Sequence, residues 1–234
     1  TPLPGRSPLD HAHGGRGAGP MSRIHHDRLV SLMKVYFVTD RHLFELETVE
    51  EACRSMLEAG VRTIQLRDKE ATAEDLLASA LRLRSLCHDY GALFIINDDP
   101  ATAARAGADG VHVGQGDAPA AAARGIIGPD AILGVSVRTP EEAAQAERSG
   151  ADYVAANGVF STPTKTDLDA PLGLEGIRRI RAATSLPVVA IGGIDSENAA
   201  EVLSAGADCL AGVRIRWDGD LMRMFAPGAD RNAR

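Results

Sequence analysis

Aromatic residues and cysteines are few in this chain, and acidic residues outnumber basic ones. Of the 234 residues, 4% are aromatic and 3 are cysteines, and the formal net charge is −7. An acidic chain argues against a partner that presents a phosphate backbone, so we expect no nucleic acid among its ligands. The 24 glycines and 44% hydrophobic content are typical of an Ala/Gly/Val-rich α/β enzyme with one large core.

The cysteines and the distribution of apolar residues bear on the cellular compartment. Cys53, Cys87 and Cys209 are odd in number, far apart and embedded in apolar patterns, which predicts reduced thiols in the core. No apolar run approaches the length of a membrane span, and the first residues carry charges where a signal peptide would need an apolar segment. We therefore expect a cytoplasmic protein without a membrane partner.

From Lys34 onward, short apolar runs alternate with helical patterns, which favours a parallel sheet. Strands are expected at 35–39, 63–67, 93–97, 110–113, 132–135, 153–155, 187–191 and 209–213. Helices are expected, among others, at 48–59, 72–90, 140–149, 174–183 and 196–205. Residues 1–33 lack an apolar period and are rich in Pro, Gly, Arg and His, so we expect a disordered N-terminal extension before one catalytic domain at 34–234.

A repeated pattern divides this domain into quarters. Segments 59–62, 106–109, 149–152 and 205–208 each place a helix-closing glycine just before an even-numbered strand. Their spacing, roughly 45 to 55 residues, is about what two βα units occupy. Four such pairs make eight strands, which predicts a closed TIM (β/α)8 barrel, with an open doubly wound sheet as the alternative. In a barrel, the chemistry belongs at the carboxyl ends of the strands.

Two neighbouring strands are each followed by a carboxylate. The run Leu93–Ile96 ends at Asn97 and Asp98, and the run Gly110–Val113 leads through glycines to Asp117. If the strands are parallel neighbours, both carboxylates leave the sheet at the same end, where they suit Mg²⁺ together with water and phosphate oxygens. The alternative is that each aspartate caps the helix that follows it, which needs no metal.

Basic and hydroxyl side chains follow other strands. Gln65, Arg67 and Lys69 alternate, so they are expected to project to one side and to suit an anion with several oxygens. With the two carboxylates, the simplest ligand is a diphosphate bridged by Mg²⁺; the alternative is a structural salt bridge between Arg67 and Asp98. A second anion site is suggested by the hydroxyls of 162–165 and the glycines of 192–193, ahead of a helix expected to begin near Ser196.

The predicted rim lacks a nucleophile paired with a base. His112 falls inside a strand and is expected to pack in the barrel. A reaction that needs no general base would fit this absence, such as the displacement of a diphosphate by a ring nitrogen that already carries a lone pair.

Six ordered motifs resemble one known family. They are Gln65-Leu66-Arg67-Asp68-Lys69, Ile96-Asn97-Asp98, the segment 110–117 (GVHVGQGD), Gly134-Val135-Ser136, Thr162-Pro163-Thr164-Lys165 and the segment 189–194 (VAIGGI). From about Val35 to Val213 the chain resembles thiamine phosphate synthase, a transferase of thiamine biosynthesis also called thiamine-phosphate pyrophosphorylase or diphosphorylase. The resemblance implies a TIM barrel that joins 4-amino-2-methyl-5-hydroxymethylpyrimidine diphosphate to a thiazole phosphate, giving thiamine phosphate and diphosphate with Mg²⁺.

The resemblance also implies roles for individual residues. The pyrimidine diphosphate would be held by Gln65, Leu66, Arg67, Asp68, Lys69, Asn97, Ser136 and Lys165. Mg²⁺ would be held by Asp98 and Asp117. The thiazole phosphate would be held by Thr162, Thr164, Gly193, Val213 and Arg214, and Pro163 is also expected to bind substrate. In the implied dissociative mechanism Arg67, Lys69, Lys165 and Ser136 are the catalytic residues, and removing Lys165 is expected to slow turnover about 10² to 10³-fold.

The chain departs from the family pattern at three places. The family usually has Gly-x-Gly-Pro after its sixth strand, whereas this chain has Ala155-Ala156-Asn157-Gly158, whose added β-carbons are expected to crowd a loop. Arg214 stands where a Ser is usual, and residues 215–234 lack the expected Ala/Leu-rich closing helix.

Three other functions fit parts of the sequence. Related thiazole tautomerases share the fold but carry a His at the position of Arg138. A Schiff-base aldolase could use Lys165 as its nucleophile. A non-catalytic protein that binds thiamine precursors would tolerate the altered loop and tail.

Overall fold

Eight parallel strands form a closed barrel in which each strand pairs with its sequence neighbours and the last pairs with the first. The computed structural model describes residues 26–43, 48–161 and 170–213. Its strands are β1 (Val35–Val38), β2 (Thr63–Leu66), β3 (Leu93–Asn97), β4 (Gly110–Val113), β5 (Ile132–Val137), β6 (Tyr153–Asn157), β7 (Val188–Ile191) and β8 (Cys209–Gly212). This confirms the predicted (β/α)8 barrel and excludes the open sheet.

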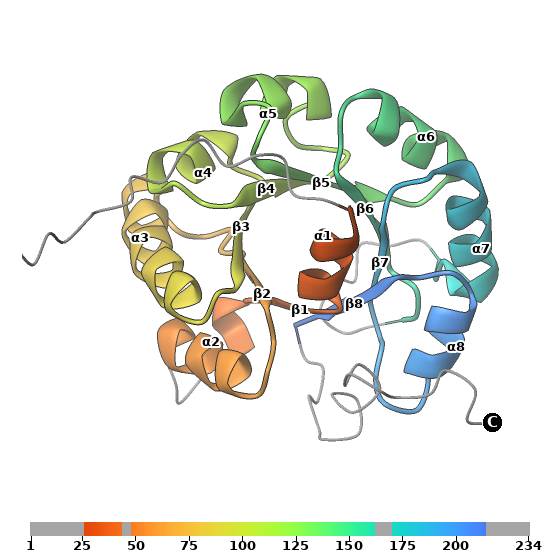
Figure 1. Ribbon diagram of the computed structural model, residues 1–234, viewed down its shortest axis with the longest axis horizontal. Coiled ribbons are helices and arrows are strands. Elements are labelled where there is room, and N and C mark those ends of the chain that lie inside the picture. Colours follow the sequence, from red (N-terminus) through yellow and green to blue (C-terminus); the bar gives the residue numbers. More distant parts are fainter. Residues whose placement is uncertain (1–25, 44–47, 162–169, 214–234) are drawn as a thin grey trace, which may run out of the picture.

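Helices surround this barrel and connect successive strands (Figure 1). They are α2 (Val49–Glu58), α3 (Ala73–Asp89), α4 (Pro100–Ala106), α5 (Ala120–Ile127), α6 (Pro140–Arg148), α7 (Gly173–Ala183) and α8 (Ala199–Ser204), with a short 3₁₀ turn at Arg41–Leu43. Two strands are longer than predicted, because β5 continues to Val137 and β6 continues to Asn157. No helix in the three described ranges is long and apolar enough to cross a bilayer.

The alternation of side chains along the strands builds two apolar layers. In β6, Val154 and Ala156 pack into the layer between strands and helices, whereas Tyr153 and Ala155 face the inside of the barrel. Because both faces are buried, the strands are apolar almost throughout. The cysteines at 53, 87 and 209 are free and buried, as predicted.

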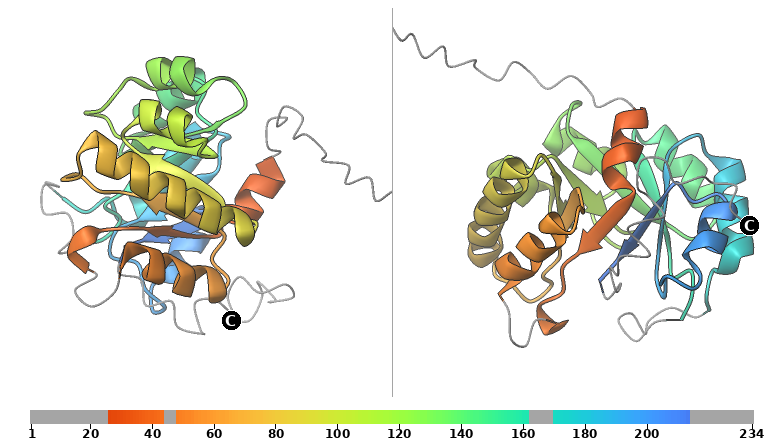
Figure 2. Two further views of the ribbon diagram at one scale, coloured as in Figure 1. Left: turned by 90° about the vertical axis from the view of Figure 1, so that its left-hand side faces the viewer. Right: turned by 60° about the horizontal axis from the view of Figure 1, so that its bottom comes forward.

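A helix before the first strand closes the amino-terminal end of the barrel. Helix α1 (His26–Met33) buries Leu29 and Met33 among interior strand residues, and Figure 2 shows it at one end of the barrel. The hydroxyl of Thr63 donates to the carbonyl of Leu32 at 2.9 Å. The predicted disorder is therefore wrong for 26–33, because contacts with the barrel stabilise a helix too short to be stable alone. Residues 1–25 and 214–234 lie outside the described residues.

The predicted repeat corresponds to a repeated hydrogen bond at this same end. The aspartate that ends each of three repeats accepts from a backbone N–H of the preceding odd-numbered strand. The pairs are Asp109 with Phe94 at 2.8 Å, Asp152 with Leu133 at 2.9 Å and Asp208 with Val188 at 2.9 Å. Each aspartate therefore holds two adjacent strands in register.

Arginines reinforce these junctions. Arg124 of α5 binds the carbonyl of Gly150 at 2.8 Å and the carboxylate of Asp152, while Arg181 of α7 binds Asp208 at 2.9 Å. The repeat thus stabilises the end of the barrel opposite the expected chemistry, where residues generally serve stability.

Candidate active site

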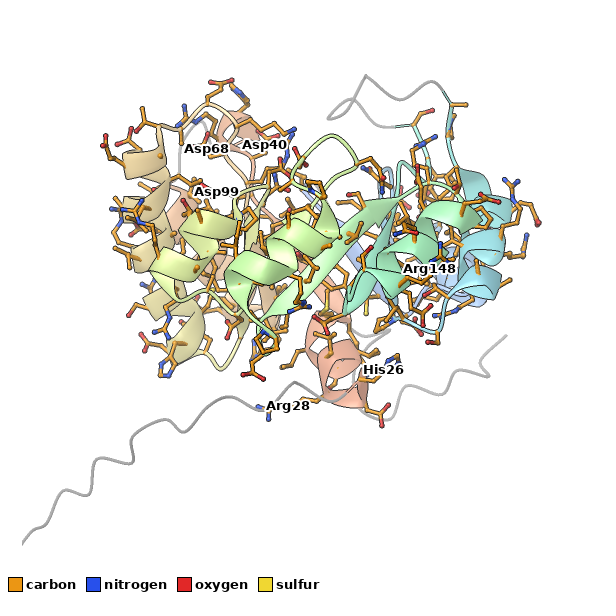
Figure 3. All side chains as sticks on the ribbon, turned by 90° about the horizontal axis from the view of Figure 1, so that it is seen from above. His26, Arg28, Asp40, Asp68, Asp99 and Arg148 are labelled. Atoms are coloured by element: carbon orange, nitrogen blue, oxygen red, sulfur yellow. The ribbon has the colours of Figure 1, made fainter. Side chains whose placement is uncertain are left out.

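A cavity of about 680 Å³ opens at the carboxyl ends of the strands and is lined by residues from all eight. It contains the predicted site residues Gln65, Arg67, Lys69, Asn97, Asp98, Asp117, Ser136, Gly193 and Val213. In Figure 3, Asp40, Asp68 and Asp99 lie at this end of the molecule, and His26 and Arg28 of α1 lie at the opposite end. The two aspartates therefore lie at the same mouth of the barrel as two of the three predicted basic residues, Arg67 and Lys69.

The two carboxylates lie in contact and cap no helix. Asp99, not Asp98, caps α4 by accepting from the N–H of Thr102 at 2.9 Å. The residue preceding α5 is Pro119, and Asp117 instead accepts from the N–H of Gly114 at 2.8 Å. The alternative that both aspartates serve as helix caps is therefore wrong.

Burial and mutual proximity together shift the pKa values of both carboxyl groups. Burial, followed by the hydrogen bond and negative charge of Asp117, raises the pKa of Asp98 to about 6. Burial also opposes ionisation of Asp117, but the hydrogen bond with Asp98 and the N–H of Gly114 outweigh it and lower the pKa of Asp117. Near neutral pH the site thus holds closely spaced negative charge that a cation would stabilise.

The donor set at this pair suits magnesium. The described residues contain no group of three or more His, Cys, Asp or Glu side chains arranged to hold a metal. Mg²⁺ needs no such group, because it usually binds one or two carboxylates and completes its shell with water and substrate phosphate. Asp98 and Asp117 therefore fit the ion that the sequence predicted.

Two cations flank the carboxylates. Nζ of Lys69 lies 3.7 Å from Oδ2 of Asp98, and a guanidinium nitrogen of Arg67 lies 3.5 Å from Oδ2 of Asp40. The hydroxyl of Thr39 accepts from the N–H of Arg67 at 2.9 Å, which fixes the chain just after β2. The predicted alternative was a structural salt bridge between Arg67 and Asp98. It is wrong, because Arg67 pairs with Asp40.

Two residues expected in the substrate site lie elsewhere. Leu66 is buried in the layer between strands and helices, since it falls between the inward-facing Gln65 and Arg67. Asp68 accepts from the N–H groups of Glu70 and Ala71, both at 3.1 Å, and does not line the cavity. The prediction gave every residue of the 65–69 motif a contact with substrate. Strand alternation brings only every second side chain to the cavity.

The floor of the cavity is a chain of hydrogen bonds that sequence analysis missed. The amide of Gln65 donates to the hydroxyl of Tyr36 at 2.6 Å, and that hydroxyl lies 2.9 Å from the hydroxyl of Tyr153. Nδ1 of His112 lies 3.0 Å from the Tyr153 hydroxyl, and its Nε2 lies 2.9 Å from the hydroxyl of Ser136. His112 packs inside the barrel as predicted, yet it also lines the cavity beside the Ser136 hydroxyl, so the expectation that no hydroxyl at the rim lies next to a base was wrong. Inward alternation along β1 and β6 was the signal for the two tyrosines.

A glycine makes room for this floor. A β-carbon on Gly134 would lie 2.1 Å from the Tyr153 ring and 2.5 Å from Nδ1 of His112. The two rings stack with centroids 5.5 Å apart. Gly134, two residues before Ser136, therefore allows the Tyr153 and His112 rings to pack together beneath the site.

The second predicted anion site is described in part. Gly193 has φ +63°, and a β-carbon there would lie 2.8 Å from the carbonyl oxygen of Ser161. The glycine is thus required by the close approach of the segment after β6. Helix α8 begins at Ala199 rather than near Ser196, so its amino terminus does not follow the glycines directly. The predicted residues Thr162, Pro163, Thr164, Lys165 and Arg214 lie outside the described residues.

The altered segment at 155–158 is mostly strand and not loop. Ala155 and Asn157 belong to β6 and line the cavity, so their side chains narrow the cavity instead of crowding a turn. Arg138, where tautomerases carry a His, donates to the carbonyls of Asn157 at 2.8 Å and Ala170 at 2.5 Å. It therefore ties the end of β5 to both sides of the β6–α7 connection.

Comparison with known proteins agrees with this geometry. The family described as thiamine monophosphate synthase matches residues 35–215. The thiamine-phosphate synthase of Moorella thermoacetica is 49% identical over 158 residues, which are 68% of this chain and 75% of that protein. That of Methanoculleus marisnigri is 45% identical over 200 residues, covering 85% and 95% of the two chains.

A solved structure supports the same assignment. Thiamine phosphate pyrophosphorylase from Pyrococcus furiosus superposes with a TM-score of 0.71 and 38% identity, over 88% of this chain and 93% of that one. Fold, cavity and sequence similarity therefore agree, and this chain belongs to the thiamine monophosphate synthase family.

Proposed function

We propose that this chain is a thiamine-phosphate diphosphorylase that joins 4-amino-2-methyl-5-hydroxymethylpyrimidine diphosphate to a thiazole phosphate. The observation that carries the proposal is the convergence of Asp98, Asp117, Arg67 and Lys69 at one mouth of the barrel. A diphosphate is the ligand that satisfies both signs of charge, since cations bind its oxygens and a metal links it to carboxylates. The free cysteines are in keeping with the proposed cytoplasmic location.

Asp98 and Asp117 would hold Mg²⁺, which when bound supplies positive charge beside the leaving diphosphate. The raised pKa of Asp98 is in keeping with this role, because burial and the neighbouring Asp117 both disfavour its negative charge, which a bound cation would stabilise. Lys69 lies 3.7 Å from Asp98, which places its ammonium group within reach of the same diphosphate.

The residues of the chain would act mainly by electrostatics. The bond between the pyrimidine methylene carbon and the diphosphate oxygen breaks, and both electrons leave with the diphosphate. The thiazole nitrogen then donates its lone pair to that carbon, so no proton has to be removed to form the new bond. Arg67 and Lys69 stabilise the charge that grows on the leaving oxygens. The family resemblance adds Lys165 to this set.

The floor would orient the aminopyrimidine ring. The hydroxyl of Ser136 is held by Nε2 of His112 at 2.9 Å, and the amide of Gln65 is held by Tyr36 at 2.6 Å. A ring with an amino group and ring nitrogens offers both donors and acceptors to such a floor. The synthase names of the relatives support this activity over a tautomerase, an aldolase or a precursor-binding protein.

The test is a single assay with both substrates, with and without Mg²⁺, that follows thiamine phosphate. We expect metal-dependent product formation, and we expect Lys69→Ala to lower kcat about 10²-fold because one donor to the leaving group is lost. The matched control is Arg148→Ala on the outer face of α6, which should leave the rate unchanged. Absence of product from the wild-type chain would refute the proposal, and normal turnover by Lys69→Ala would remove that lysine from the mechanism.

A further inference from the structure

Asn157 presents a carboxamide to the active-site cavity from the last residue of β6. Tyr153 and Ala155 face the barrel interior, whereas Val154 and Ala156 face the helices. Strand alternation therefore directs the Asn157 side chain inward as well. Asn157 is half-buried and lines the cavity together with Ser161 and Gly192.

The backbone carbonyl of Asn157 and the carboxamide of its side chain differ in their hydrogen bonding to the described residues. Arg138 donates to the Asn157 carbonyl at 2.8 Å, and the N–H of Gly158 donates to the carbonyl of Ile191 at 2.8 Å. Within the described part of the chain, the carboxamide makes no hydrogen bond to another residue. A half-buried amide with two donors and an acceptor gains most from a ligand that satisfies them.

Its position in the ring of strands indicates which ligand this is. Arg67 and Lys69 follow β2, which lies opposite β6 in the closed order of eight strands. The leaving diphosphate would occupy the side of β2 to β4. The acceptor would then occupy the remaining side of the cavity, which β6 and β7 line.

We propose that Asn157 determines specificity for the acceptor, donating a hydrogen bond from its carboxamide to a polar group of the phosphorylated five-membered heterocycle. This proposal rests on the proposed function for the identity of that acceptor. Arg138 is a positioning residue in this arrangement, because it fixes the carbonyl of Asn157 and hence the direction of the side chain.

The test measures binding of each substrate separately to the full chain by calorimetry, together with KM for each. Asn157→Gly should raise Kd and KM for thiazole phosphate roughly three- to tenfold, as expected for one neutral hydrogen bond, and change those for the pyrimidine diphosphate less than about twofold. Asn157→Asp keeps the shape but replaces the donor by a negative charge, so it should weaken thiazole phosphate binding by more than about tenfold. Gln145→Ala, an exposed carboxamide on α6, is the control and should change neither substrate.

Several outcomes would overturn the proposal. They are an unchanged Kd for thiazole phosphate in Asn157→Gly, an equal loss for both substrates, or tighter binding in Asn157→Asp. The isosteric Asp variant decides the matter if the Gly variant fails to fold. If the wild-type chain binds thiazole phosphate but forms no product, the proposed function fails while the comparison of Kd values still tests Asn157. No binding by the wild-type chain would overturn both.

Discussion

Asp98 combines an unusual backbone conformation with a carboxyl group that interacts with that of Asp117. Among the described residues other than glycine, it alone has a positive φ, at 64°. Aspartate and asparagine tolerate this left-handed region better than other side chains do. Its N–H donates to the carbonyl of His112 at 2.7 Å, which ties the turn after β3 to β4. The turn conformation directs the carboxylate toward Asp117.

We expect Asp98→Asn to weaken the apparent affinity for Mg²⁺ at least about tenfold without loss of stability, because asparagine keeps the turn and removes one carboxylate. Asp98→Ala should lose the same affinity and also about 1 kcal/mol of unfolding free energy, because alanine is strained at this φ. Magnesium titrations of turnover and thermal melts measure the two effects. An unchanged magnesium requirement in Asp98→Asn would exclude Asp98 as a ligand.

At the scale of elements, α1 closes the barrel on the side away from the chemistry. Met33 is 0% exposed and Leu29 is 2% exposed, and both pack among inward-facing strand residues. The exposed side of the helix carries His26 and Arg28 (Figure 3). The helix therefore contributes apolar burial to the core, and none of its residues lines the cavity.

Met33→Ala should lower the unfolding free energy by about 2 to 5 kcal/mol, as large-to-small core substitutions do. KM for both substrates should stay unchanged, since the cavity opens at the other end of the barrel. Urea denaturation of Met33→Ala and of the exposed control Arg28→Ala measures the difference, and the control should change by less than about 0.5 kcal/mol. Equal stabilities of the two variants would show that α1 does not close the barrel in solution.

At the scale of the molecule, the two ends of the barrel serve different purposes, and three similar junctions stabilise the amino-terminal end. The carboxylates of Asp109, Asp152 and Asp208 hold adjacent strands at the amino-terminal end. The polar side chains at the opposite end are therefore available to bind ligands, because they are not needed to hold adjacent strands together. Stability and chemistry thus use different ends of the same strands.

Asp152→Ala should cost about 3 kcal/mol of unfolding free energy, because it removes the only carboxylate that the structure shows bound to Arg124 in the described residues and the side-chain acceptor of the N–H of Leu133. Asp208→Ala should cost less, since the Asp208 side chain is 33% exposed against 9% for Asp152. The exposed pair of Glu175 and Arg178 provides a control, and Glu175→Ala should change stability by less than about 1 kcal/mol. Chemical denaturation at one pH measures all three; equal costs for Asp152→Ala and Asp208→Ala would contradict the role of burial.

Sequence alone was sufficient for the barrel and for most of its mouth. Strands buried on both faces produce short continuous apolar runs, and a fourfold repeat needs eight of them, so periodicity was enough to predict the closed sheet. The alternation at Gln65, Arg67 and Lys69 likewise predicted three inward side chains, all of which line the cavity. These features can be predicted because they follow from the spacing of residue types within short segments of the chain.

Only the tertiary structure decided the rest. Whether Asp98 capped a helix or met Asp117 depended on which residue the chain placed at the start of α4. The floor of Tyr36, Tyr153 and His112 joins three strands that are distant in sequence, and α1 is held by contacts that its own residues do not specify. Such contacts form between segments that only folding brings together, so strand alternation can place a side chain inside the barrel but does not specify its partner.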